Sequence, residues 1–287
     1  PNPSGHVGEV STGNDKGTLF QNMSGLGGLQ GINNGTTRFF VPLYFWFSRN
    51  PGLALPMIAL QYNDVEIRIK TNFGLAYDTK PTNNLWTDFI YLDTDERRRF
   101  AEGEHEYLIE QLQEQPMNTG NATTTLNFNY PVKELIWTTG VATSSGALMT
   151  LKAPVDHTVT LQLNGHDRFS AQKQEYFGLR QPFDYHSAVP GPNLPQRAEG
   201  VYYHGEGGEH GRTGNVVTSC VSPIYVYSFA LKPEEHQPSG TCNFSRIDNA
   251  KLILSTTPAG TNICKIFAVN YNVLRIMSGM GGLAYSN

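Results

Sequence analysis

Five glutamates and one histidine lie close together near the middle of the chain, where paired carboxylates could do acid–base chemistry. They are Glu102, Glu104, His105, Glu106, Glu110 and Glu114. General acid–base catalysis needs an enclosing cleft that raises the pKa of one carboxylate, and nothing in the neighbouring sequence supplies one. On a β-strand, Glu102, Glu104 and Glu106 would share one face. We interpret the group as a wet or subunit-facing surface and expect no catalytic residue in it.

A second group with ligand chemistry lies between His204 and His210. Its two imidazoles and two carboxylates suit zinc or manganese, but their spacing matches no known ligand frame and the intervening glycines would fix them poorly. The three cysteines, Cys220, Cys242 and Cys264, are widely spaced and include no CxxC pair. We therefore predict no metal and no cofactor, and we expect the cysteines to be buried or half-buried thiols.

Arg97, Arg98 and Arg99 form a short positive run that could contact phosphate. Acidic residues lie within five positions on both sides, which favours ion pairing within the chain or between subunits, or a solvated face. The formal net charge of −4 also argues against a protein that wraps nucleic acid. The sequence contains no GxSxG, HExxH or GxxxxGK[ST] motif. We expect neither an enzyme nor a protein that binds nucleic acid sequence-specifically.

The last eighteen residues, 270–287, have the pattern of an alternating strand that ends in a glycine-rich sequence. A glycine cluster after a strand binds phosphate when a helix follows and directs its N-terminus at the anion. Only three residues follow Ala284, which leaves no room for such a helix. We expect Gly279, Gly281 and Gly282 to serve backbone packing, where one part of the chain passes close to another.

The composition favours an all-β protein with many turns. Charged residues make up 16% of the chain and aromatic residues 11%, and both Gly (29) and Pro (17) are frequent. Short apolar runs are separated by Gly, Pro and Asn, which is typical of a sandwich or jelly roll. No window approaches the ~20 apolar residues of a membrane span, and the N-terminus lacks the pattern of a secretion signal.

Strands are expected along most of the chain. In the N-terminal third, we predict a strand buried on both faces at 39–47, an alternating strand at 65–70 and an aromatic strand at 86–92. Asp93 and Glu96 form a capping-box pattern, which predicts a short helix or turn over 95–101. Further strands are predicted at 107–112, 126–130, 135–138, 158–163, 224–231, 251–255 and 263–277, with a hairpin turn at Asn164-Gly165.

Residues 184–223 contain many prolines, glycines and polar side chains and resist assignment to strands. A loop of this length is normally functional or mobile, and we expect it at the surface because buried irregular backbone is costly. Three Asn-x-Ser/Thr sequons lie in loop-like sequence, at Asn22, Asn34 and Asn121, and are candidates for glycosylation.

Seven blocks resemble, in the same order, the major capsid protein of large icosahedral double-stranded DNA viruses of the kind that infect algae. They are 39–65 (FFVPLYFWFSRNPGLALPMIALQYNDV), 93–113 (DTDERRRFAEGEHEYLIEQLQ), 126–137, 161–169 (LQLNGHDRF), 224–233 (IYVYSFALKP), 237–250 (QPSGTCNFSRIDNA) and 270–287 (NYNVLRIMSGMGGLAYSN). The resemblance implies a tandem double jelly roll, two eight-stranded β-sandwiches, whose copies assemble as trimers into pseudo-hexagonal capsomers of an icosahedral shell.

The same resemblance implies the partners and the location. The partners would be further copies of the chain, neighbouring capsomers and minor capsid proteins beneath the shell, and the protein would lie in the virion, often glycosylated. The family's connection that matches 184–223 is shorter, so the chain departs from the family pattern here. Because the Pro and Gly content of this loop cannot sustain ladder hydrogen bonds, we expect it on the capsid exterior or at an intersubunit seam. A further sequon, at Asn243, falls inside one of the matching blocks, so there we expect a structural side-chain hydrogen bond instead of a glycan.

The resemblance divides the chain into three parts. Residues 1–94 would hold an N-terminal arm and the last strands of the first jelly roll, 95–104 the connector, and 105–287 the second jelly roll. A jelly roll needs eight strands and about three precede the connector, so we expect the remaining strands to come from sequence absent from this chain. The chain begins at Pro1, which fits a fragment or a processed form.

The alternative is a carbohydrate-binding or glycosidase-associated β-sandwich, which shares this composition. Sugar platforms need aromatic side chains on one exposed face, and Trp86, Trp137 and Tyr185 are the candidates. Because apolar strand residues flank both tryptophans, we interpret them as core.

Overall fold

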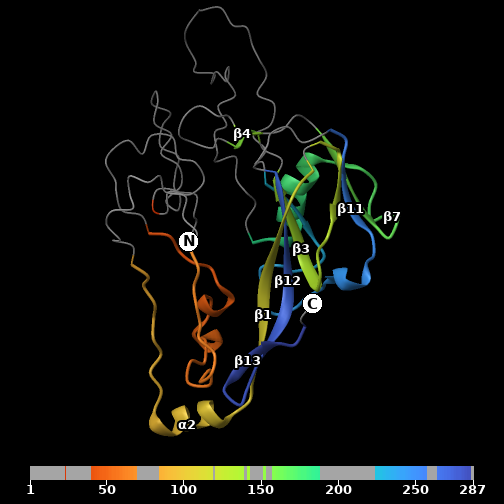
Figure 1. The fold of residues 1–287 in the computed structure, drawn as a ribbon. Helices are drawn as coiled ribbons and strands as arrows, with labels where there is room; N and C mark the ends of the chain where they lie inside the picture. The colour runs from red at the N-terminus through yellow and green to blue at the C-terminus, as the bar shows by residue number, and fades with distance from the viewer. Residues whose placement is uncertain are drawn as a thin grey trace, which may run out of the picture. The chain divides into compact units, whose positions relative to one another are not determined.

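The computed structural model describes residues 23, 40–69, 84–118, 120–138, 141–142, 151–152, 157–187, 224–256 and 264–285. These residues are mostly antiparallel β-structure (Figure 1). The chain divides into two compact units: unit 1 contains Pro1–Pro42 and Gln111–Tyr271, and unit 2 contains Leu43–Glu110 and Asn272–Asn287. Two long strands, β1 (His105–Pro116) and β12 (Lys265–Met277), have residues in both units.

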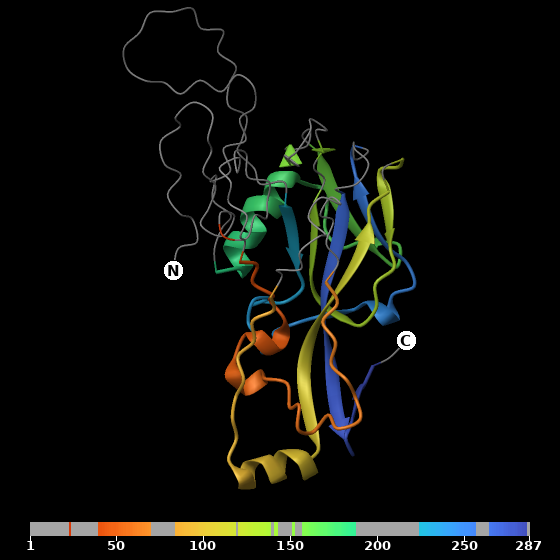
Figure 2. The ribbon, with the colours of Figure 1, turned by 60° about the vertical axis from the view of Figure 1, so that its left-hand side comes forward.

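Two sheets account for most of the strands. The six-stranded sheet runs β1, β12, β3 (Pro131–Thr138), β10 (Cys242–Asn243), with β9 (Ile224–Ser228) beside β3 and β13 (Met280–Leu283) beside β12. The five-stranded sheet runs β2 (Thr123–Leu126), β11 (Ala250–Leu254), β6 (Thr158–Leu163), β7 (His166–Asp167), with β8 (Gln172–Lys173) beside β6. Figure 2 shows β12 alongside β1, and a separate short pair joins β4 (Val141–Ala142) to β5 (Leu151–Lys152).

The core of unit 1 follows from the alternation of apolar residues along these strands. Successive residues of β11 are alternately buried and half-buried, as expected when one face of a sheet packs on the core. The buried cluster draws on both sheets, with Leu161 and Leu252 from one and Trp137, Tyr225 and Ile266 from the other. The expected all-β sandwich architecture is therefore present in unit 1.

Two amide side chains of β1 join the two sheets at one edge of unit 1. Gln113 donates from Nε2 to the carbonyl oxygen of Asn129 (2.7 Å) and accepts the Asn129 N–H at Oε1 (3.0 Å). Gln115 repeats the arrangement with the Thr125 carbonyl and the Asn127 N–H (2.9 Å for the latter). These side chains satisfy backbone groups of the 125–129 segment that a neighbouring strand would otherwise pair.

Local sequence signals fix the turns. Asn164 and Gly165 both have positive φ, 50° and 82°, as a two-residue hairpin between β6 and β7 requires. The Asn164 Oδ1 also accepts the backbone N–H of Asp248 at 3.0 Å. The predicted hairpin is confirmed.

The predicted helix start is also confirmed. Helix α2 (Thr94–Glu102) begins after Asp93, whose side chain accepts backbone N–H groups of the first turn while Glu96 reaches back to the Asp93 N–H. This reciprocal arrangement is a capping box. Gly103 follows the helix, and its N–H bonds the Arg99 carbonyl at 3.0 Å.

Most of the later strands lie where the sequence predicts them, but the strand predicted at 126–130 is wrong beyond Leu126, where β2 ends, because side chains of β1 pair the backbone there in place of a strand. One helical segment was missed. β1, β3, β6, β9, β11 and β12 cover most of the predicted ranges. The missed segment is the π-helical stretch η4 (Tyr176–Arg180), which continues directly into α3 (Gln181–Tyr185). A short 3₁₀ turn, η5 (Phe244–Arg246), follows β10.

The three strands predicted in the N-terminal third are wrong for the residues that the structure describes. The 39–47 segment is irregular and ends in the 3₁₀ turn η1 (Trp46–Ser48), with η2 (Pro51–Leu53) after it, and neither 65–69 nor 84–92 forms a strand. A strand exists only when a neighbour accepts and donates its ladder hydrogen bonds, and no described segment supplies that neighbour here. Apolar alternation alone therefore did not produce a strand.

Several predictions fall on residues outside the described part of the chain. These are the 188–223 part of the long loop with the His204–His210 group, together with Cys220, Asn22 and Asn34. Among the described residues, no helix is both long and apolar enough to cross a bilayer.

Candidate assembly surface

Several large aromatic side chains of unit 2 are exposed to solvent. Tyr91 is 91% exposed, Trp86 86% and Phe89 74%, and Tyr44 and Tyr62 are each 75% exposed. Single exposed apolar residues are ordinary, but several large ones within residues 44–91 make this part of unit 2 a candidate interaction surface. We call Tyr44, Tyr62, Trp86, Phe89 and Tyr91 the exposed aromatic set.

Other aromatic side chains of unit 2 pack on β1 and fix the surrounding segments. Trp46 stacks edge-on against Phe47, with ring centroids 5.3 Å apart, and lies 5.9 Å from the Tyr107 ring. His105 stacks on Phe100 of α2, and its Nε2 lies 2.8 Å from the Phe100 carbonyl oxygen. Burial raises the pKa of the Tyr107 hydroxyl. These partly buried rings form a small aromatic cluster in unit 2, to which none of the exposed aromatic set belongs.

Three glutamates of the acidic group identified in the sequence form ion pairs. Glu106 pairs with Arg275 (2.7 Å) and Glu110 with Arg49 (2.8 Å), while Glu114 pairs with Lys265. The Glu110 side chain is only 6% exposed, so its charge is held by a partner and not by water. These three glutamates are four positions apart along β1, so they lie on the same face of the strand.

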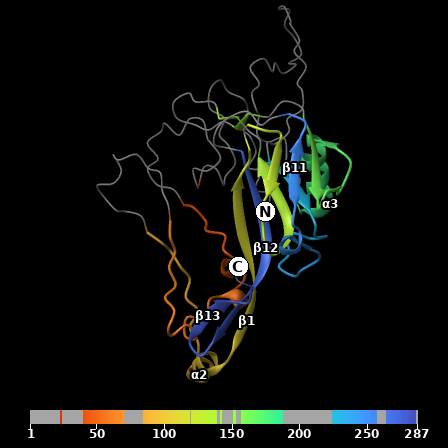
Figure 3. The same ribbon diagram turned by 45° about the vertical axis from the view of Figure 1, so that its right-hand side comes forward.

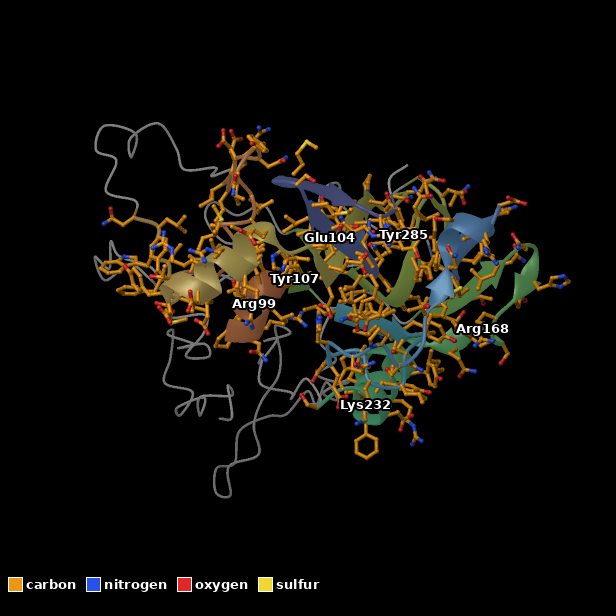
Figure 4. The ribbon with its side chains drawn as sticks, turned by 90° about the horizontal axis from the view of Figure 1, so that it is seen from below. Arg99, Glu104, Tyr107, Arg168, Lys232 and Tyr285 are labelled. Carbon is orange, nitrogen blue, oxygen red and sulfur yellow. The ribbon has the colours of Figure 1, made fainter. Side chains whose placement is uncertain are left out.

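The remaining members of the acidic group lie elsewhere. Glu102 belongs to the last turn of α2, and Glu104 lies before β1 begins at His105, so the expected common strand face of Glu102, Glu104 and Glu106 is wrong. The reason is that the capped helix extends through Glu102. Figure 4 labels Glu104, Tyr107 and Arg99, and Arg99 lies on α2.

Arg97, Arg98 and Arg99 are exposed on α2. They form no ion pair with any other described residue, so intrachain pairing with the described residues is excluded, and both the solvated face and an interface stay predictions. Pairing with another subunit stays a prediction.

The C-terminal glycines lie in the hairpin of β12 and β13, visible in Figure 3. Gly279 has φ +80°, and a Cβ built there would lie 2.5 Å from the Cδ2 atom of the Tyr62 ring. A Cβ at Gly281 would lie 3.0 Å from Leu60, whereas one at Gly282 would have no atom within 4 Å. The Tyr62 N–H bonds the Gly279 carbonyl oxygen at 2.9 Å. The packing role of these glycines stays a prediction, for which the geometry gives a sharp test.

Other predicted residues have ordinary environments. Cys242 is half-buried and Cys264 buried, neither is in a disulfide, and burial raises the pKa of each thiol, which confirms the expectation for these two. The Asn243 Oδ1 accepts the Ser245 N–H at 3.1 Å, so the structural hydrogen bond expected there is confirmed. Asn121 is exposed, and its Oδ1 accepts the Thr123 N–H at 3.1 Å. Glycosylation at Asn121 stays a prediction.

The structure excludes one of the three aromatic residues proposed to bind sugar in the alternative, a carbohydrate-binding β-sandwich. Trp137 is fully buried and packs against Phe177, so it cannot stack on a sugar. Tyr185 is half-buried at the end of α3, and Trp86 is exposed. The interpretation of the tryptophans as core is therefore right for Trp137 and wrong for Trp86.

Comparison with known proteins places this fold. Residues 96–196 and 218–282 match the family model described as large eukaryotic DNA virus major capsid protein, and residues 9–93 match the model of the major capsid protein N-terminus. The chain belongs to the family of large eukaryotic DNA virus major capsid proteins.

Individual relatives and solved structures agree. The chain is 51% identical to the major capsid protein of Pyramimonas orientalis virus, over 86% of this chain and 61% of that protein. It is 38% identical to the major capsid protein of Paramecium bursaria Chlorella virus 1, over 87% of this chain and 67% of that protein. The structure resembles a chain of the quasi-atomic model of the PBCV-1 virus capsid, with a TM-score of 0.64 and 33% identity over 93% of this chain and 75% of that one. The chain thus spans about three fifths to two thirds of the curated relatives it matches.

Proposed function

We propose that this chain is part of a structural building block of an icosahedral viral shell, in which three copies form a pseudo-hexagonal capsomer. The observation that carries the proposal is the exposed aromatic set, because large apolar side chains in such number are stable in water only when another surface covers them. Obligate assemblies bury more than about 2,000 Å² and are rich in apolar contacts. Family membership supports the same role.

The proposed role is mechanical. The glutamates of β1 that suggested acid–base chemistry each have a basic partner, which supports a stabilising role in place of a catalytic one. The proposed partners are further copies of the chain, neighbouring capsomers and minor capsid proteins beneath the shell. We keep the division into residues 1–94 as the C-terminal part of a first jelly roll, 95–104 as connector and 105–287 as a second jelly roll.

The oligomeric state of the protein isolated from virions tests the proposal that three copies form a capsomer. Multi-angle light scattering should give a mass of three protein chains. A monodisperse monomer at capsid-like concentration, or specific binding on a glycan array, would favour the carbohydrate-binding alternative instead.

The proposed division predicts how separate pieces of the chain behave. Residues 105–287 contain the core of unit 1 and should be soluble and rich in β-structure, although they lack the Tyr62 contact to Gly279. Residues 1–94 carry the exposed aromatic set without a core and should aggregate. Size-exclusion chromatography and circular dichroism of the two pieces check this.

A variant of the 1–94 piece shows whether its exposed aromatic side chains cause the aggregation. In residues 1–94, replacing Trp86, Phe89 and Tyr91 by serine should raise the soluble fraction several-fold. If unmodified 1–94 forms a soluble, cooperatively folded domain, the proposed division, with 1–94 as an incomplete part of a first jelly roll, is wrong.

A further inference from the structure

A layer of polar side chains is buried between the helical segment η4–α3 and strands β3 and β9, all within unit 1. Gln181 is central: its Oε1 accepts the Ser228 N–H at 3.1 Å, and its Nε2 donates to the Tyr176 hydroxyl at 2.9 Å. Phe177 of the same segment packs edge-on against Trp137, with ring centroids 5.1 Å apart. The helical segment is therefore held on the sheet by both apolar and polar contacts.

The polar layer ends in an ionisable pair. The His186 Nε2 lies 3.0 Å from the Glu134 Oε2, and the two side chains are only 14% and 11% exposed. The next residue, Ser187, donates its N–H to the Glu234 Oε2 at 3.1 Å. Carboxylates from β3 and from the turn after β9 thus meet the residues that follow α3.

The charges around His186 favour its protonated form. The hydrogen bond to Glu134 raises the pKa of His186 most, burial opposes it, and the charges of Glu134 and Glu234 and the Gln181 carbonyl raise it further, with a net upward shift. Among the other charged side chains of these elements, Arg180 pairs with Asp184 and Lys232 with Glu235. The buried Lys133 of β3 lies over the Tyr271 ring, with its Nζ 5.4 Å from the ring centroid. If His186 lost its proton, the largely buried Glu134 carboxylate would be left without a cation, which costs free energy. The charged form of the pair is therefore favoured.

We propose that His186, Glu134 and Glu234 form a proton-operated latch, which holds the C-terminal end of α3 against β3 while the imidazole is charged and loosens it once the imidazole is neutral. The sign of the pH dependence follows. A pKa raised in the folded state gives stability that is fully present below the ordinary histidine pKa, about 6.5. That stability is lost as the pH rises through the folded-state pKa. The latch is therefore closed in mildly acidic solution and weakens toward alkaline pH.

The test is an NMR titration of the full chain. His186 should titrate above the ordinary histidine pKa of about 6.5. After correction for intrinsic exchange, the amide protection of His186 and Ser187 should fall as the pH rises through the folded-state pKa. The expected loss is up to about tenfold for each unit by which that pKa exceeds the ordinary value. Titration of His186 at or below the ordinary histidine pKa of about 6.5, or amide protection that does not change with pH, would overturn the proposal.

Variants provide an independent readout. His186→Gln and Glu134→Gln should each lower the unfolding midpoint most below about pH 6.5 and progressively less above the folded-state pKa. His166→Gln, the matched control, should shift the midpoint little at any pH. A His186→Gln effect of equal size across the whole pH range would show that the histidine only fills space. If these variants do not fold, the wild-type titration decides.

Discussion

Replacing Trp137 by alanine is expected to lower the free energy of unfolding of the sandwich by about 3–5 kcal/mol. Trp137 is completely buried, and its ring contacts Phe177 at 5.1 Å and Tyr225 at 6.0 Å between centroids. Removing the indole leaves a cavity that these neighbours can fill only in part. Urea denaturation followed by circular dichroism measures the change, and a loss of this size would shift the midpoint by more than about 1 M.

Trp86 supplies the matched control, since the same residue type there is 86% exposed. Trp86→Ala should change the free energy of unfolding of this chain by less than about 0.5 kcal/mol. The same substitution in protein assembled into shells should weaken assembly, because there we expect the indole to be covered. Equal effects of the two substitutions on the stability of this chain would contradict the assignment of Trp137 to the core and of Trp86 to an assembly surface.

Replacing Gly279 by valine is expected to destabilise unit 2 by about 2–5 kcal/mol, from two causes that add. The left-handed backbone at φ +80° disfavours any residue with a Cβ, by about 1–2 kcal/mol, and β-branched residues most. The new Cβ would also lie 2.5 Å from the Tyr62 ring, and such overpacking costs about 1–3 kcal/mol. Limited proteolysis at residues 60–63 and 277–283 should become faster, because their mutual contacts are lost.

Substitutions at the two neighbouring glycines should destabilise the protein less than Gly279→Val. Gly281→Val should be intermediate, since its Cβ would meet Leu60 at 3.0 Å, and Gly282→Ala should be nearly neutral, since nothing lies within 4 Å. If all three variants fold and assemble normally but one loses affinity for a nucleotide, the glycines serve a ligand and the packing interpretation is wrong.

The predictable part of the fold is the part that local sequence controls. Asp93 and Glu96 define the helix start, and Asn164-Gly165 the hairpin, because each depends on residues a few positions apart. Strands such as β6 and β11 were predictable because one face packs on the core and the other does not. The aromatic segment 86–92 shows the limit: its pattern is that of a strand, but a strand also requires a partner that local sequence cannot specify.

The charged surface shows the same limit. That Glu106, Glu110 and Glu114 share one strand face was readable from alternation, but their partners Arg275 and Arg49 come from distant sequence. The segment η4–α3 was missed because Pro182 and Gly178 lie inside it. Its one helical signal was the spacing of Arg180 and Asp184, which form an i,i+4 ion pair.

Imaging the native assembly tests most directly the proposal that this chain is part of a building block of a viral shell. Cryo-electron microscopy of virus particles that contain the protein should show trimeric, pseudo-hexagonal capsomers, with the sandwich of unit 1 fitting into each subunit. In the same map, density from other strands or subunits should cover Trp86, Phe89 and Tyr91. A shell whose capsomers do not accommodate this sandwich, or a map in which these three side chains face solvent, would contradict the account.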